Sequence, residues 1–111
     1  MKIELLREEL LRPLQGVVGV VERRQTLPIL GNVRIEAESS GAIRLTATDL
    51  EVEMTADVAA GAKEAGATTV PARKLLDICR ALPEASTITL REQQGRLQLK
   101  AGNSRFTLGT L

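Results

Sequence analysis

Residues 33–58 read VRIEAESSGAIRLTATDLEVEMTADV, and this stretch decides the fold. Apolar and polar residues alternate along three of its segments, and such a period of two predicts consecutive half-buried antiparallel strands. Turns are expected at residues 39–41 and 48–49, where small and polar residues gather. One face is apolar and the other carries mostly acids, so the stretch predicts a three-stranded meander with an acidic outer face. The expected inner face comprises Val33, Ile35, Ala37, Ile43, Leu45, Ala47, Leu50, Val52, Met54, Ala56 and Val58.

A strand and a helix are predicted before the meander. Residues 2–6 fit a short strand. The apolar residues that follow recur at the spacing of a helix packed on a sheet, namely Leu10, Leu14, Val17, Val18 and Val21. Pro13 interrupts this stripe, which predicts either a kink or a main helix that begins near Arg12.

The same order of elements is predicted again after the meander. Residues 59–67 are small, polar and glycine-containing, and we interpret them as a linker. A strand at 68–70 precedes a second helix, which begins at Pro71 and ends before Pro83. Its apolar face comprises Leu75, Ile78, Cys79 and Leu82. Three further strands are expected at 87–91, 96–101 and 104–110.

An internal repeat accounts for this order. A shift of 54 residues places Gly41, Ile43, Leu45 and Ala47 on Gly95, Leu97, Leu99 and Ala101, and Val52 and Met54 on Phe106 and Leu108. The shift fails for the strand before, where Val33 and Ile35 would meet threonines, so an indel or a register change is expected between them. The predicted fold class is α+β, a duplicated β-α-β-β-β unit with two helices on one side of two antiparallel four-stranded sheets.

Composition narrows the function. The 111 residues suffice for one domain with its own core. Phe106 is the only aromatic residue, which argues against a protein that stacks bases on aromatic rings. There is no histidine and only one cysteine, so a disulfide within the chain and a usual zinc site are excluded. No signal sequence or membrane span is evident, and we expect a cytoplasmic protein without a membrane partner.

Charge is unevenly distributed along the chain. The net charge is +1, but residues 32–57 hold two bases and six acids, whereas residues 71–111 hold seven bases and three acids. These segments therefore carry net charges of −4 and +4. Such a domain can present opposite signs on different surfaces.

Four blocks of sequence, in order along the chain, resemble one protein family. They are TLPILGN (26–32), LTATDLEVEM (45–54), ATTVPARKLLDICRALPE (67–84) and SRFTLGTL (104–111). Together they closely resemble the N-terminal domain of the bacterial sliding clamp, the beta subunit of DNA polymerase III. The resemblance implies the DNA-clamp fold and a ring around duplex DNA, built head to tail from two three-domain chains. Such a ring tethers the polymerase without catalysing a reaction, and it uses no cofactor.

The resemblance also implies roles for individual residues. Those matching DNA-contacting or hole-lining positions are Arg24, Arg73, Arg12 and Arg80, and those matching the subunit boundary are Phe106, Leu108, Lys74, Arg96 and Arg105. Asn103 stands where the family often has a base, so one ion pair of that boundary is expected to be missing. The family's cleft for polymerase and clamp loader lies between the second and third domains, which are absent from these 111 residues.

Other interpretations of these residues remain. From composition alone, Arg24 and Arg73 are solvated surface charges, and Phe106 could simply fill the core. Asp49, Glu51 and Glu53 lack the ligand types and glycine-bearing loop of a calcium or magnesium site, so we expect no metal there and interpret the acids as an outer face that repels DNA.

Two alternative functions are a protein-interaction module and an enzyme. Cys79 is expected to be an inert core thiol, because no histidine is present to activate it and the sequence offers no other paired nucleophile and base. An enzyme with catalytic residues is therefore disfavoured. The principal alternative to a clamp is a protein-interaction module that works by strand addition at residues 104–110 without binding DNA.

Overall fold

The computed structural model describes residues 1–23, 31–48 and 53–110. In chain order the elements are β1 (Lys2–Leu6), α1 (Arg7–Arg23), β2 (Asn32–Ala37), β3 (Ile43–Thr48), β4 (Glu53–Val58), β5 (Ala62–Glu64), β6 (Gly66–Pro71), α2 (Ala72–Ala81), β7 (Thr87–Gln93), β8 (Arg96–Ala101) and β9 (Ser104–Gly109). The predicted order of a strand, a helix and three strands, occurring twice, is confirmed.

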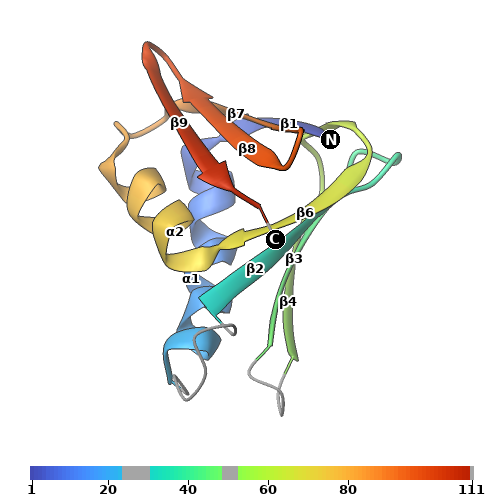
Figure 1. Ribbon diagram of the computed structural model, residues 1–111, viewed down its shortest axis with the longest axis vertical. Coiled ribbons are helices and arrows are strands. Elements are labelled where there is room, and N and C mark those ends of the chain that lie inside the picture. Colours follow the sequence, from blue (N-terminus) through green and yellow to red (C-terminus); the bar gives the residue numbers. More distant parts are fainter. Residues whose placement is uncertain (24–30, 49–52, 111) are drawn as a thin grey trace.

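The strands form two antiparallel sheets, and each sheet contains strands from both halves of the chain. One sheet has the order β4-β3-β2-β6 and the other the order β5-β1-β7-β8-β9. Each sheet thus joins the meander of one half to the first strand of the other half, and the two helices lie side by side on one side of both sheets (Figure 1). The α+β class and the duplicated plan are confirmed, with five strands in one sheet where four were expected.

The fifth strand comes from the segment interpreted as a linker. Within residues 59–67, β5 pairs with β1, and the last two residues already belong to β6. The Gly61 carbonyl accepts a hydrogen bond from the Glu4 amide at 2.8 Å. Gly61 has φ +128°, and a Cβ there would lie 3.0 Å from Ile43 Cδ1. The linker interpretation is therefore wrong, because this segment is fixed by the N-terminal strand.

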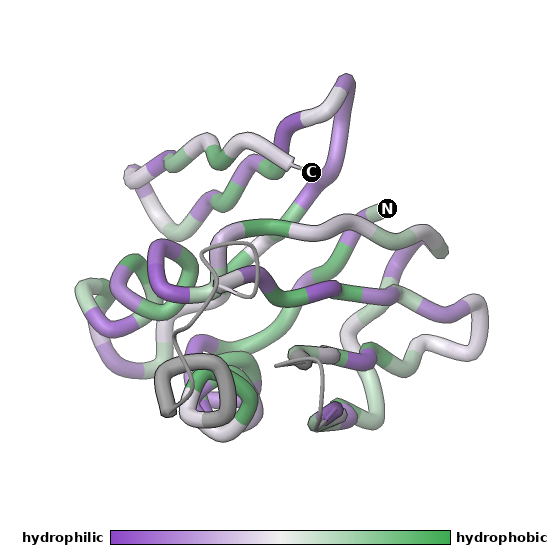
Figure 2. Tube along the Cα trace, turned by 60° about the horizontal axis from the view of Figure 1, so that its bottom comes forward, coloured by the Kyte–Doolittle hydropathy of each residue, from purple (hydrophilic) through white to green (hydrophobic). Residues whose placement is uncertain are grey.

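The core lies between the helices and the inner faces of the sheets. Hydropathy alternates along β8 and β9 in Figure 2, and the apolar positions of the first two meander strands are buried as predicted. The third strand, β4, is less well covered, since Met54, Ala56 and Val58 are half-buried. Leu50 and Val52 lie outside the described residues.

Helix α1 begins at Arg7, so the alternative in which the main helix begins near Arg12 is wrong. The Leu6 amide donates to Glu9 Oε1 at 2.9 Å, and the Arg7 amide donates to the Ser86 carbonyl at 2.8 Å. A glutamate that reaches back over the first turn in this way stabilises a helix N-terminus. The helix then continues through Pro13. The predicted apolar stripe is buried at Leu10, Leu14, Val17 and Val18.

Helix α2 agrees closely with the prediction. Pro71 precedes the helix as its N-cap, and the chain leaves the helix at Leu82 with ψ 151°, the extended conformation favoured before Pro83. Its buried face comprises Ala72, Leu75, Leu76 and Cys79. Ile78 is half-buried at the margin of this face, and Leu82 is buried just beyond the helix.

Strand pairing defines the repeat more closely than the sequence did. Ile35 pairs with Leu45 and Leu90 pairs with Leu99, so β2 matches β7 at a shift of 55, whereas β3 matches β8 at 54. The shift of 54 fails for the strand before because the turn between β7 and β8 is one residue shorter than the turn between β2 and β3.

The second hairpin corrects the alignment of the last strand. Leu45 pairs with Ala56, and Leu99 pairs with Phe106. Phe106 therefore corresponds to Ala56 and not to Val52, and Leu108 corresponds to Val58 and not to Met54. The shift of 54 fails here because the connection between equivalent strand pairs is shorter in the second half.

Candidate nucleic-acid interface

Helix α2 carries two of the predicted DNA-contacting residues on one exposed stripe. Arg73 and Arg80 are two helical turns apart, on the side of α2 away from the buried face. Arg73 Nε lies 3.1 Å from Asp77 Oδ1, in an exposed pair four residues apart. The stripe is exposed to solvent, and the Asp77 carboxylate offsets part of the charge of Arg73.

Arg12 is exposed on α1 but has acidic neighbours. It lines a hollow of about 400 Å³ together with Glu8, Glu9 and Asp57. The carboxylates lower the local potential, so Arg12 is a weaker candidate for binding phosphate than Arg80. Arg24, the fourth predicted residue, lies outside the described residues.

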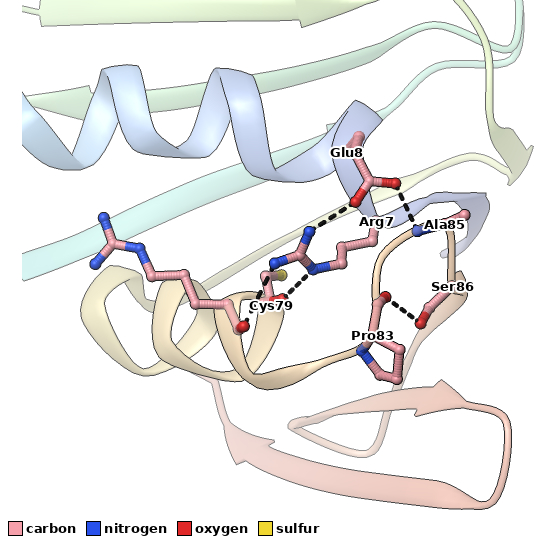
Figure 3. A network of polar contacts seen from close by, with 7 residues as sticks. Arg7, Glu8, Cys79, Pro83, Ala85 and Ser86 are labelled. Carbon is pink, nitrogen blue, oxygen red and sulfur yellow. Dashed lines mark hydrogen bonds and ion pairs between the residues drawn. The ribbon is translucent and has the colours of Figure 1, made fainter.

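A polar network at the start of α1 fixes the end of α2 (Figure 3). Arg7 Nε donates to the Cys79 carbonyl at 2.7 Å, and Arg7 Nη2 donates to the Arg80 carbonyl at 3.4 Å. A guanidinium group at the carbonyl end of a helix complements its dipole. The side chain of Arg7 is only 13% exposed, so this contact is largely shielded from water. It holds the two helices that carry Arg12, Arg73 and Arg80 against each other.

Glu8 extends the same network into the loop after α2. Its carboxylate lies 2.7 Å from Arg7 Nη1 and accepts a hydrogen bond from the Ala85 amide at 2.9 Å. Ala85 has φ +61°, a conformation that is unfavourable for a residue with a Cβ. The hydrogen bond from Arg7 lowers the pKa of Glu8, and the amide of Ala85 contributes to the same shift. The sequence pattern did not predict this network. Glu9, at the third position of the helix, was nevertheless a signal for the helix start.

Cys79 occupies the core position predicted for it. It is fully buried, and burial raises the pKa of its thiol to about 11, with a smaller opposing effect from Arg7. A thiol that stays protonated at neutral pH is a poor nucleophile.

The residues predicted at a subunit boundary fall into two groups. Phe106, Leu108 and Lys74 line one hollow of about 400 Å³ between β9 and α2, together with Ile78. Leu108 is 5% exposed and belongs to the core, whereas Phe106 is half-buried and packs against it. Strand β9 is the last strand of its sheet within the described residues. An apolar hollow beside an edge strand is a suitable place for another protein surface to dock.

Arg96 and Arg105 lie on the opposite face of β8 and β9. Arg96 is opposite Gly109, and Arg105 is opposite Lys100; both arginines alternate with inward-facing residues. The five predicted boundary residues therefore flank β9 on both of its faces.

The outer faces of the two sheets differ in charge. On the four-stranded sheet, Arg44 pairs with Asp57 at 2.9 Å and Arg34 with Glu36 at 3.2 Å, so the predicted acidic face is partly neutralised. A count of charged residues in the sequence could not show that these side chains form ion pairs.

Asp49 and Glu51 lie outside the described residues, so the absence of a metal site around them stays a prediction. Where the chain is described, no helix is both long and apolar enough to cross a membrane.

Comparison with known proteins identifies relatives along the whole chain. Residues 1–111 match the family model described as DNA polymerase III beta subunit, N-terminal domain. The beta sliding clamps of Pseudomonas aeruginosa and of Escherichia coli strain K12 are 54% and 51% identical to the chain. Both matches cover 100% of this chain, which spans 30% of the length of each relative.

Solved structures agree with these sequence matches. The crystal structure of the DNA polymerase III subunit beta from Pseudomonas aeruginosa superimposes with a TM-score of 0.92 at 51% identity, covering all of this chain and 30% of that one. Caulobacter crescentus pol III beta gives a TM-score of 0.91 at 40% identity, with the same coverage.

Proposed function

This chain belongs to the family of the DNA polymerase III beta subunit N-terminal domain, and we propose that it forms one domain of a ring-shaped processivity factor. In this role the ring encircles duplex DNA, tethers the replicative polymerase and catalyses no reaction. Two further domains would complete the subunit, and two subunits arranged head to tail would complete the ring. The protein would act in DNA replication in the cytoplasm, without a cofactor.

The family match over all 111 residues carries this proposal. The exposed arginines on the paired helices support it further, since a sliding ring needs contacts to phosphates, which are the same at every sequence. Arg73 and Arg80 are the principal candidates, and Arg12 and Arg24 are further ones. Polymerase III and the clamp loader would bind through domains outside this chain.

The subunit boundary is proposed at β9. Phe106 and Leu108 supply apolar surface next to α2, and Lys74, Arg96 and Arg105 place positive charge around it. Such a boundary fits an acidic partner surface on a third domain. The alternative, an interaction module without DNA binding, would use the same free edge by strand addition.

DNA binding by the full-length polypeptide tests the two functions. Replacing Arg24 and Arg73 by Ala should weaken binding to duplexes of every sequence alike, while the fold and the dimer persist. The matched control replaces Arg34 and Arg44 by Ala, which removes the same charge from the outer face of the four-stranded sheet. Equal DNA affinity of both variants and the unmodified protein at low salt would favour the interaction module.

A further inference from the structure

A hollow of about 360 Å³ lies on the outer face of the five-stranded sheet. It adjoins the hollow between β9 and α2, since Phe106 and Thr107 line both, but its charged side chains lie on the face of the sheet opposite the buried Ile3 and Leu90. Its polar lining includes Lys2, Thr89, Arg91, Gln98, Lys100 and Arg105, which come from β1, β7, β8 and β9.

Strand register concentrates positive charge in this hollow. Lys2 is directly opposite Arg91, and Lys100 is directly opposite Arg105. Like charges in facing positions of antiparallel strands destabilise a sheet. None of these four side chains forms an ion pair within the part of the chain that the structure describes. Glu64 is directly opposite Lys2 on its other side and Glu4 is directly opposite Thr89, but neither glutamate lines the hollow.

The other sheet shows that this arrangement is not general for the molecule. On its outer face, Arg44 and Arg34 each have a carboxylate partner within 3.2 Å. Arginines on one outer face therefore pair with carboxylates, whereas the cations that line the hollow on the other form no ion pair within the described residues. An acidic ligand would relieve the repulsion between the facing cations.

We propose that this hollow is a docking site for an acidic, extended segment of a partner protein. Arginine binds carboxylates through two parallel hydrogen bonds, and Thr89 and Gln98 can serve the backbone of such a segment. A nucleic-acid strand fits less well, since Phe106 is the only aromatic residue of the chain, so no more than one base could stack on a ring in this hollow. Because Arg105 also belongs to the proposed subunit boundary, the docking site depends chiefly on Lys2, Arg91 and Lys100.

The test measures binding of a fluorescently labelled oligoglutamate peptide to the 111-residue chain at low ionic strength. The variant Arg91→Gln/Lys100→Gln should raise the dissociation constant about tenfold, since it removes two of the exposed cations that would pair with the peptide carboxylates. The control Arg34→Gln/Arg44→Gln removes the same charge from the other sheet and should change the constant less than about twofold. Amide resonances of Thr89 and Gln98 should shift as the peptide is added.

Three outcomes would overturn the proposal. Equal weakening by both variants would mean general attraction of an acidic peptide to the chain. Peptide binding that leaves the Thr89 and Gln98 resonances in place would put the ligand elsewhere. A labelled oligothymidylate that binds more tightly than the peptide and depends on the same two residues would make the face a nucleic-acid surface. None of these results bears on the ring, since Arg24 and Arg73 are unchanged throughout.

Discussion

Among the charged residues that the structure describes, Arg7 should contribute the most to the stability of this domain. Its guanidinium group is largely buried and donates to the Cys79 carbonyl at 2.7 Å. Arg7→Met would keep the apolar stem but leave that carbonyl without its charged donor, and should lower the free energy of unfolding by about 2 kcal/mol. Urea denaturation measures the loss. Arg12→Met, on the exposed side of the same helix, is the control and should cost less than about 0.5 kcal/mol. Similar losses in both variants would show that Arg7 acts only as a surface charge.

Glu8 should make the stability of the domain depend on pH in the acid range. Its pKa in the folded chain is lowered below the ordinary value of 4.5, chiefly by the hydrogen bond from Arg7. A carboxylate with a depressed pKa stabilises the fold above its unfolded pKa, and this contribution is lost as the pH falls through the folded pKa. Glu8→Gln should therefore destabilise the domain at neutral pH and flatten the fall in urea midpoint on acidification. Glu84→Gln removes an exposed carboxylate from the loop after α2 and should leave the shape of the profile unchanged.

At the scale of helices and strands, the sequence predicts the buried positions correctly wherever apolar residues recur regularly over a whole element. The stripe of α1 and the alternation along β2, β3 and β8 reproduce the buried positions of the structure. It was insufficient for β5, because those three residues are held by pairing with a strand some 60 positions away. The register of β9 was also missed, since the alternation in the strand fits several registers that keep the same face inward, and the length of the connection decides between them.

Strand β9 is where core and interface roles can be separated. Leu108→Ala should cost about 2 to 4 kcal/mol in the isolated chain, because Leu108 is 5% exposed, whereas truncation of the half-buried Phe106 should cost only about 1 to 2 kcal/mol. In the full-length dimer, Phe106→Ala should raise the dissociation constant about 30-fold, the loss expected for an interface hot spot of about 2 kcal/mol. Thermal unfolding and analytical ultracentrifugation measure the two effects. An unchanged dimer, with an isolated chain that no longer folds, would place Phe106 in the core.

For the molecule as a whole, the sequence predicts which arginines are exposed but not which charged side chains lie near them. Periodicity places Arg73 and Arg80 on the exposed side of α2, and the structure agrees. The carboxylates near Arg12 come from α1 and from β4, and only the folded chain brings Asp57 to them. The basic face formed by Lys2, Arg91 and Lys100 likewise depends on the pairing of three strands from opposite ends of the chain.

The balance of charge on α2 leads to a prediction for DNA binding by the isolated chain. One domain cannot encircle a duplex, so its affinity should be weak and independent of sequence, with log K falling by about 0.9 per phosphate contact as log salt rises. Asp77 lies 3.1 Å from Arg73 and competes with phosphate for it. Asp77→Asn should therefore tighten duplex binding about two- to fivefold at low salt, through the loss of one nearby negative charge. Glu36→Gln makes the same change of net charge on the outer face of the four-stranded sheet, next to Arg34, and should alter the affinity less than about twofold. Fluorescence anisotropy with two unrelated duplexes measures both variants. If Glu36→Gln strengthened binding as much as Asp77→Asn, the duplex would be responding to net charge alone, and the exposed stripe of α2 would not be its binding surface.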